Sequence, residues 1–149
     1  MPSPRMSAPS TIDILNRLYV LHQRSLAMYL HYAPPNQLAQ HPRAAVMLAQ
    51  MVADQTRTAD KLATLILQSN GLVDPGEFPM AFTGLHDLSL DYLVKLLIER
   101  QVRHIAACER LAAALNMAPY TQAAAREAVG EAKGHLDNLQ ELAAAPVAA

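Results

Sequence analysis

Residues 71–88 read GLVDPGEFPMAFTGLHDL and separate two long amphipathic segments of the chain. This stretch is unusually long for a connection between the helices of a bundle. About 18 extended residues reach on the order of 60 Å, whereas a helix of about 27 residues is roughly 40 Å long. The stretch can therefore run along a whole bundle, so that the helices before and after it are parallel. Its apolar residues predict that it packs on those helices, namely Phe78, Met80, Phe82 and Leu85.

Four helices are predicted around this connection, at residues 11–33, 42–70, 89–115 and 119–144. Apolar residues recur in each segment at the spacing of one helix face. Ser10 and Ser89 are good N-caps, and Pro34 ends the first segment. We expect one all-α domain over residues 11–145, a four-helix bundle with one long crossover between its second and third helices. The Pro/Ser-rich residues 1–10 predict a disordered segment.

The composition excludes several classes of protein. Of the 149 residues, 52% are apolar, and the formal net charge of −1 gives no field that favours nucleic acid or an acidic membrane surface. No apolar run is long enough to cross a bilayer, and the N-terminal MPSPRMSAPS lacks the apolar centre of a secretory signal. Cys108 is the only cysteine, which excludes an internal disulfide and predicts a small buried residue. We expect a cytoplasmic protein that binds neither nucleic acid nor membrane.

The centres of the four predicted helices carry the residues that indicate a function. They are, in chain order, His22, Gln55, Thr58, Glu99, Ala132 and His135. Residues 55–62 read QTRTADKL, and residues 132–139 read AKGHLDNL. In this register the chain resembles the ferritin-like superfamily of bacterioferritin-, rubrerythrin- and Dps-like proteins. Di-iron members of this class carry a Glu on each of two helices and a Glu-x-x-His on each of the other two.

The resemblance implies a degenerate di-iron site. Two irons need about four carboxylates together with imidazoles, and this chain offers Glu99, His22 and His135. The other expected positions hold residues that cannot replace the ligands, namely Gln55, Thr58 and Ala132. This set argues against ordinary ferroxidase activity and predicts at most one divalent metal, iron or manganese, at His22, Glu99 and His135. The alternative is a metal-free network of hydrogen bonds among the same residues.

Three acidic residues near these positions are further candidates. Asp60 and Asp137 could orient metal-bound histidines from a second layer of contacts. Glu131 precedes the expected ligand position of the last helix by one residue, and a helix bulge at Gly130 or Gly134 would rotate it inward.

Further alternatives stay open within the resemblance. A Dps-like subunit would use His31, His41 and Asp60 in a metal site between subunits. A metal-free bundle could instead serve as a dimeric interaction scaffold. No haem is expected, because Thr56 stands where bacterioferritins carry their haem-ligating Met. The resemblance also implies a homodimer or a higher homo-oligomer.

Overall fold

The computed structural model describes residues 10–145, which form five α-helices and three short 3-10 helices without any strand. The α-helices are α1 (Thr11–Gln23), α2 (Leu26–Tyr32), α3 (Pro42–Gln68), α4 (Leu90–Ala114) and α5 (Pro119–Ala144). The 3-10 helices are η1 (Leu38–Gln40), η2 (Met80–Phe82) and η3 (Leu85–Asp87). The predicted all-α class is confirmed. Of the segment predicted to be disordered, only Ser10 lies within the described residues, where it forms a capping box with Asp13 at the start of α1.

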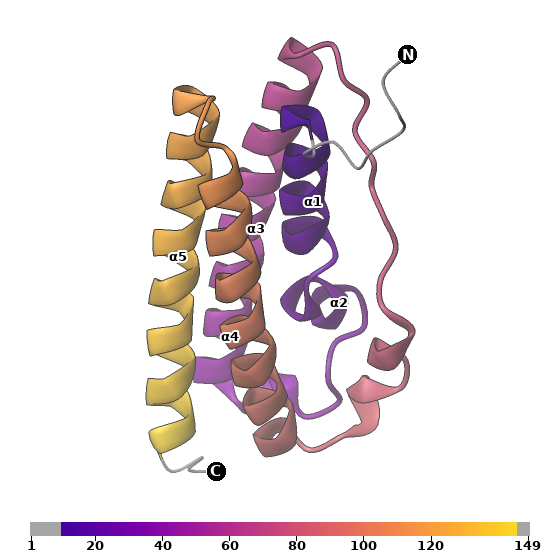
Figure 1. The fold of residues 1–149 in the computed structure, drawn as a ribbon. Helices are drawn as coiled ribbons and strands as arrows, with labels where there is room; N and C mark the ends of the chain where they lie inside the picture. The colour runs from indigo at the N-terminus through magenta and orange to yellow at the C-terminus, as the bar shows by residue number, and fades with distance from the viewer. Residues whose placement is uncertain (1–9, 146–149) are drawn as a thin grey trace.

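The long helices pack as two pairs, α1 with α3 and α4 with α5, and contacts of α3 with α5 and of α1 with α4 join the pairs. Residues 71–88 run beside these helices from the end of α3 to the distant start of α4 (Figure 1). As a result, α3 and α4 point in the same direction, as the length of the connection predicted. None of the helices within residues 10–145 combines the length and apolarity needed to span a bilayer.

The first predicted helix is wrong in one respect, because the chain leaves helical geometry at Arg24 and Ser25. Ser25 has extended dihedral angles (φ −69°, ψ 164°) and starts α2 as its N-cap, accepting a hydrogen bond from the Met28 amide at 3.2 Å. The Ser25 hydroxyl also donates to Oε1 of Gln55 on α3 at 2.6 Å. These two hydrogen bonds stabilise the break, and α2 departs from the direction of α1 (Figure 1).

Two large apolar clusters lie at opposite ends of the long helices, and Ala44, Leu90 and Val94 form a smaller third one. Of the two large clusters, one is centred on Leu15, Ile66 and Ala125, and the other on Leu30, Met51 and Leu93. Between them, in the middle of the helices, lie the buried polar side chains, namely His22, Gln55, Gln101, His104 and His135. Burying polar groups is costly unless they find partners, so this central layer is where the fold gives up apolar stabilisation.

Several contacts hold the long connection against α1. Asn16 donates to the Leu72 carbonyl at 3.0 Å and accepts from the Asp74 amide at 2.7 Å. Gly76 has φ +60°, and a Cβ at this position would lie 2.9 Å from methyl groups of Val20, so a residue without a side chain is required.

The apolar side chains of the connection behave as predicted with one exception. Phe82 and Leu85 are buried, and Phe78 is partly buried against the core. Met80 is 87% exposed, so the prediction that it packs on the helices is wrong.

Candidate functional site

The structure brings two of the three predicted metal ligands into the central layer and excludes the third. His22 on α1 and His135 on α5 are buried. Glu99 on α4 is exposed, so the prediction that it reaches the centre of the molecule is wrong. The reason is the register of α4, in which Gln101 and His104 face inward. Glu99 lies two residues before Gln101, or about 200° away around the helix.

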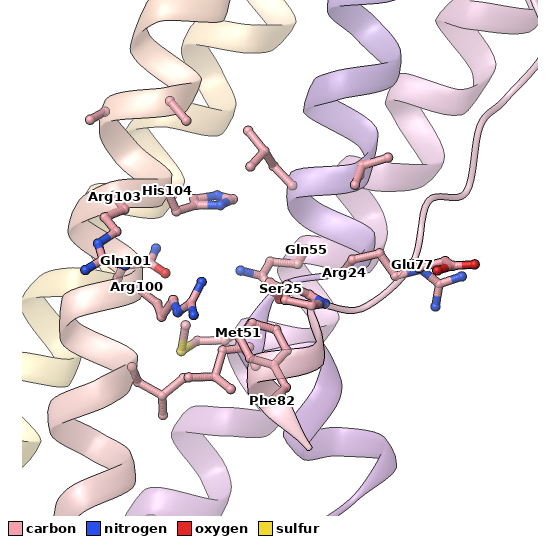
Figure 2. A pocket seen from close by; sticks show the side chains of 18 of the residues that line it. Arg24, Ser25, Met51, Gln55, Glu77, Phe82, Arg100, Gln101, Arg103 and His104 are labelled. Atoms are coloured by element: carbon pink, nitrogen blue, oxygen red, sulfur yellow. The ribbon is translucent and has the colours of Figure 1, made fainter. Parts of the chain in front are cut away.

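Two side chains that the sequence prediction missed complete the centre. The candidate ligand atoms of His22, His104 and Cys108 all lie within 4.8 Å of one another, and all three residues are buried. The rings of His22 and His104 meet edge to face with their centroids 4.9 Å apart, and Sγ of Cys108 lies 3.6 Å from Nε2 of His104. His104 points from α4 toward the space between α4 and α1 (Figure 2). A His and a Cys four residues apart on one helix face were a signal available in the sequence.

The contacts of His22 fix its tautomer. Its Nδ1 lies 2.8 Å from the carbonyl oxygen of Leu18, one turn earlier in α1. A carbonyl can only accept a hydrogen bond, so Nδ1 carries the proton and Nε2 keeps its lone pair. Burial lowers the pKa of His22 and outweighs the hydrogen bond to the Leu18 carbonyl, which raises it; the charge of His135 lowers it further, so the ring is neutral. A neutral imidazole oriented by a backbone carbonyl is the usual state of a metal-binding histidine.

The other two members of the cluster are also held in their neutral forms. Burial, with smaller contributions from His22 and His135, lowers the pKa of His104 to about 3. Burial, with a smaller contribution from Glu109, raises the pKa of the Cys108 thiol to about 12. The buried, uncharged Cys108 matches the prediction of a small buried residue. A metal ion at this position would have to displace the thiol proton.

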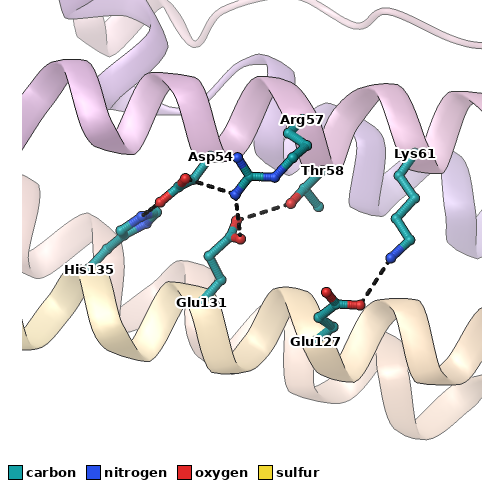
Figure 3. Close-up of polar contacts among 7 residues, drawn as sticks. All are labelled: Asp54, Arg57, Thr58, Lys61, Glu127, Glu131 and His135. Atoms are coloured by element: carbon teal, nitrogen blue, oxygen red, sulfur yellow. Dashed lines mark hydrogen bonds and ion pairs between the residues drawn. The ribbon is translucent and has the colours of Figure 1, made fainter.

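His135 is held by a different partner from those predicted. Its Nε2 lies 2.7 Å from a carboxylate oxygen of Asp54 on α3 (Figure 3). Burial opposes ionisation of Asp54, but the hydrogen bonds and charges of His135 and Arg57 outweigh it and lower the pKa of Asp54. Asp60 and Asp137, the carboxylates predicted to orient histidines, are both exposed.

Glu131 does not turn toward the centre. The helix α5 is continuous from Pro119 to Ala144, and the side chain of Glu131 crosses to α3, where Thr58 donates to it at 3.0 Å and Arg57 approaches it at 3.4 Å (Figure 3). Gly130 and Gly134 are exposed and introduce no bulge. Thr58 thus joins an inter-helix contact at the edge of the molecule.

The remaining predicted positions have structural partners. Gln55 accepts from Ser25, and the carbonyl of Ala132 accepts from Nε2 of Gln101 at 3.0 Å. His31 lies in α2 and is exposed. His41 directly precedes α3, at the other end of the connection between these two helices, and is half-buried. An intersubunit site at His31, His41 and Asp60 needs a second chain and stays a prediction.

The donor set of the central layer does not fit two irons. Within residues 10–145, the buried polar side chains are three imidazoles and two amides, joined by one thiol, and no carboxylate is among them. Two iron ions need several carboxylates to bridge them and to neutralise their charge. Two imidazoles and a thiolate suit instead a single softer ion such as Zn²⁺ or Cu⁺.

The central cluster is the feature of this chain that points most directly to a chemical role, because it gathers metal-ligand side chains from two helices distant in sequence. Comparison of the chain with protein-family models, with curated proteins and with solved structures finds no match.

Proposed function

We propose that this protein is a metal-binding helical bundle that holds one transition-metal ion per chain through His22, His104 and Cys108. The observation that carries the proposal is the approach of three buried ligand atoms to within 4.8 Å of one another. A metal bound to all three would sit between α1 and α4 and join the two helix pairs. Such a site would stabilise the folded chain, since the unfolded chain lacks it.

The chemistry of these donors favours Zn²⁺ or Cu⁺ over the iron or manganese expected from the resemblance. Thiolate and imidazole are soft or borderline ligands, whereas manganese prefers carboxylate and water oxygen. A single thiolate neutralises Cu⁺ fully and Zn²⁺ by half. Low net charge matters here because His22 is only 2% exposed and Cys108 is 0% exposed, so an excess charge would be poorly solvated.

Neighbouring groups support the same site. The Leu18 carbonyl orients His22, so that Nε2 is the atom left for a metal. The charge of His135 that lowers the pKa of His22 and His104 would also oppose a metal cation, and the Asp54 carboxylate, 2.7 Å from Nε2 of His135, offsets that charge.

We also propose that the fold is a ferritin-like four-helix bundle in which this single site has replaced the di-iron centre. The long connection beside the helices, with α3 and α4 parallel, supports this topology. Ordinary ferroxidase activity is not expected, because no carboxylate is among the buried polar side chains of residues 10–145. A homodimer stays a prediction, which sedimentation equilibrium at micromolar concentration would test.

A Co²⁺ titration of the full chain tests the metal site, because a cobalt–thiolate bond produces a charge-transfer absorption band that imidazole or carboxylate ligation does not. We expect this band to saturate at one Co²⁺ per chain. It should be absent from Cys108→Ala and weakened in His22→Gln, and unchanged in His31→Gln, which alters an exposed histidine. Circular dichroism would confirm that each variant is folded. A folded native protein that develops no thiolate band would overturn the proposal.

A further inference from the structure

A cleft of about 490 Å³ opens between α1 and α4, next to the central cluster. Its lining includes Gln55, Gln101 and His104 of the central layer, together with Glu77 and Phe82 of the connection (Figure 2). This volume lies in the range of sites that bind small molecules. The cleft is thus large enough for a ligand, and it reaches a side chain of the proposed metal site.

The charge around the cleft is strongly unbalanced. Four arginines line it, namely Arg24, Arg100, Arg103 and Arg110, whereas Glu77 is the one carboxylate in its lining. In the described part of the chain, the ion pairs form elsewhere, and none of them includes an arginine of the cleft. The whole chain has a formal net charge of −1, so this concentration of positive charge is local. Unpaired guanidinium groups around a concave surface favour an anion.

Two of these guanidinium groups are held in place by aromatic rings. That of Arg100 lies over Phe82, 4.9 Å from the ring centre, and that of Arg24 lies over Phe78 at 4.8 Å. Arg24 also donates through Nε to the Pro75 carbonyl at 3.0 Å. Cation–π contacts leave the hydrogen-bond donors at the edge of a guanidinium group free for a ligand, and they reduce the entropy lost on binding.

The rest of the lining is mainly apolar. The apolar side chains that stay partly exposed in the cleft include Val20 and Leu21 of α1 and Ala107 of α4. Oε1 of Gln55 accepts from Ser25, which leaves the amide nitrogen of Gln55 to face the cleft (Figure 2). An inorganic anion would satisfy the arginines but would leave this apolar surface in contact with water.

We propose that the cleft binds a small amphipathic organic anion, whose carboxylate pairs with Arg100 and whose apolar body covers Val20, Leu21 and Ala107. The site goes beyond metal binding and does not depend on it, because its arginines and its apolar surface are present in the chain itself. If a metal is bound as well, the ligand lies next to His104 and limits the access of water to the ion.

Octanoate is a suitable probe, and titration of the chelator-treated, ¹⁵N-labelled full chain followed by NMR measures its binding without any contribution from a metal. We expect saturable shifts of amides on α1, α4 and the connection. Octanol, which lacks the charge, and inorganic phosphate, which lacks the tail, should each bind at least about tenfold more weakly than octanoate. Equal binding of octanol or of phosphate would overturn the proposal, as would the absence of saturable shifts with octanoate.

Two variants locate the site, and one serves as a control. Arg100→Met keeps a long side chain but removes the charge, and it should weaken octanoate binding about tenfold, the loss of one charge-assisted hydrogen bond. Ala107→Leu adds volume inside the cleft and should weaken binding by a similar factor. Arg126→Met removes an exposed arginine of α5 outside the cleft and should leave the affinity unchanged. Native affinity in both cleft variants would contradict this location. Failure of Co²⁺ binding with intact octanoate binding would refute the metal site alone.

Discussion

The affinity of the proposed site for a metal should depend on pH through a single proton. The pKa of Cys108 is raised to about 12 by burial, so at neutral pH its thiol is protonated and must lose this proton to become a ligand. The pKa of His104 is lowered to about 3 and that of His22 is also lowered, so both rings are already neutral. Binding of one metal ion should therefore release one proton, from Cys108.

The magnitude follows from this count of protons. Below the thiol pKa, each rise of one pH unit lowers the cost of deprotonation by about 1.36 kcal/mol, which is a tenfold gain in affinity. Between about pH 6 and pH 8 the association constant should rise about a hundredfold. If the histidine ligands were exposed, their own protonation near the ordinary pKa of about 6.5 would make the metal affinity depend more steeply on pH. The buried rings of this site should not add such a dependence.

Competition for Zn²⁺ between the protein and a chelator of known pH-dependent affinity measures how the logarithm of the association constant changes with pH. Calorimetry in buffers of different ionisation enthalpy counts the released protons independently. In Cys108→Ala, whatever weak binding remains should lose the dependence on pH. A native affinity that does not vary with pH would refute the thiolate as a ligand. A slope of two protons would refute the neutral state of the two imidazoles.

Three further predictions concern stability, measured by urea unfolding. Gly134→Ala should stabilise the chain by about 1 kcal/mol, because nothing lies within 4 Å of the added Cβ in the middle of α5. Gly76→Ala should destabilise the chain by at least as much, because its φ is +60° and Val20 of α1 lies too close to the added Cβ. Changes of the same sign in the free energy of unfolding of the two variants would contradict this expectation. Ile66→Ala removes a side chain that is 0% exposed and should cost about 2–5 kcal/mol, whereas a loss well below this range would mean that the cluster can collapse around the gap. Because the pKa of Asp54 is lowered in the folded chain, its ionised form adds to the free energy of unfolding above the ordinary carboxyl range, and this stabilisation is lost as the pH falls through the folded-state pKa. Asp54→Asn weakens the contact with His135, so its free energy of unfolding should fall less in acid than that of the native chain. An unchanged dependence of stability on pH would count against this contact.

The helices and their order could be predicted because they depend on local signals. The buried face of α3, from Leu48 to Ile66, follows the apolar spacing of the sequence, and the length of residues 71–88 allows a connection along the helices. The break at Ser25 escaped prediction because apolar spacing continues through it. Its stabilising partner, Gln55, is 30 residues away in the sequence and comes close only in the fold.

The site was predicted in part for a similar reason. Polar residues near the centres of the helices correctly identified His22 and His135 as buried. The choice of Glu99 over His104 depended on the rotation of α4, which the positions of its apolar residues define only loosely. The contact between His135 and Asp54 joins α5 to α3 across 81 residues, a pairing that spacing within one helix does not reveal.

The metal content of protein purified without chelators, measured by elemental mass spectrometry per folded chain, is the most direct test of the proposed metal site. We expect close to one zinc or copper ion per chain in the native protein and in the control His31→Gln. The ion should be lost in Cys108→Ala and its content reduced in His22→Gln, and both variants should stay folded. A native chain that holds no ion even after zinc and copper are supplied, or one that holds two iron ions, would contradict the proposed site.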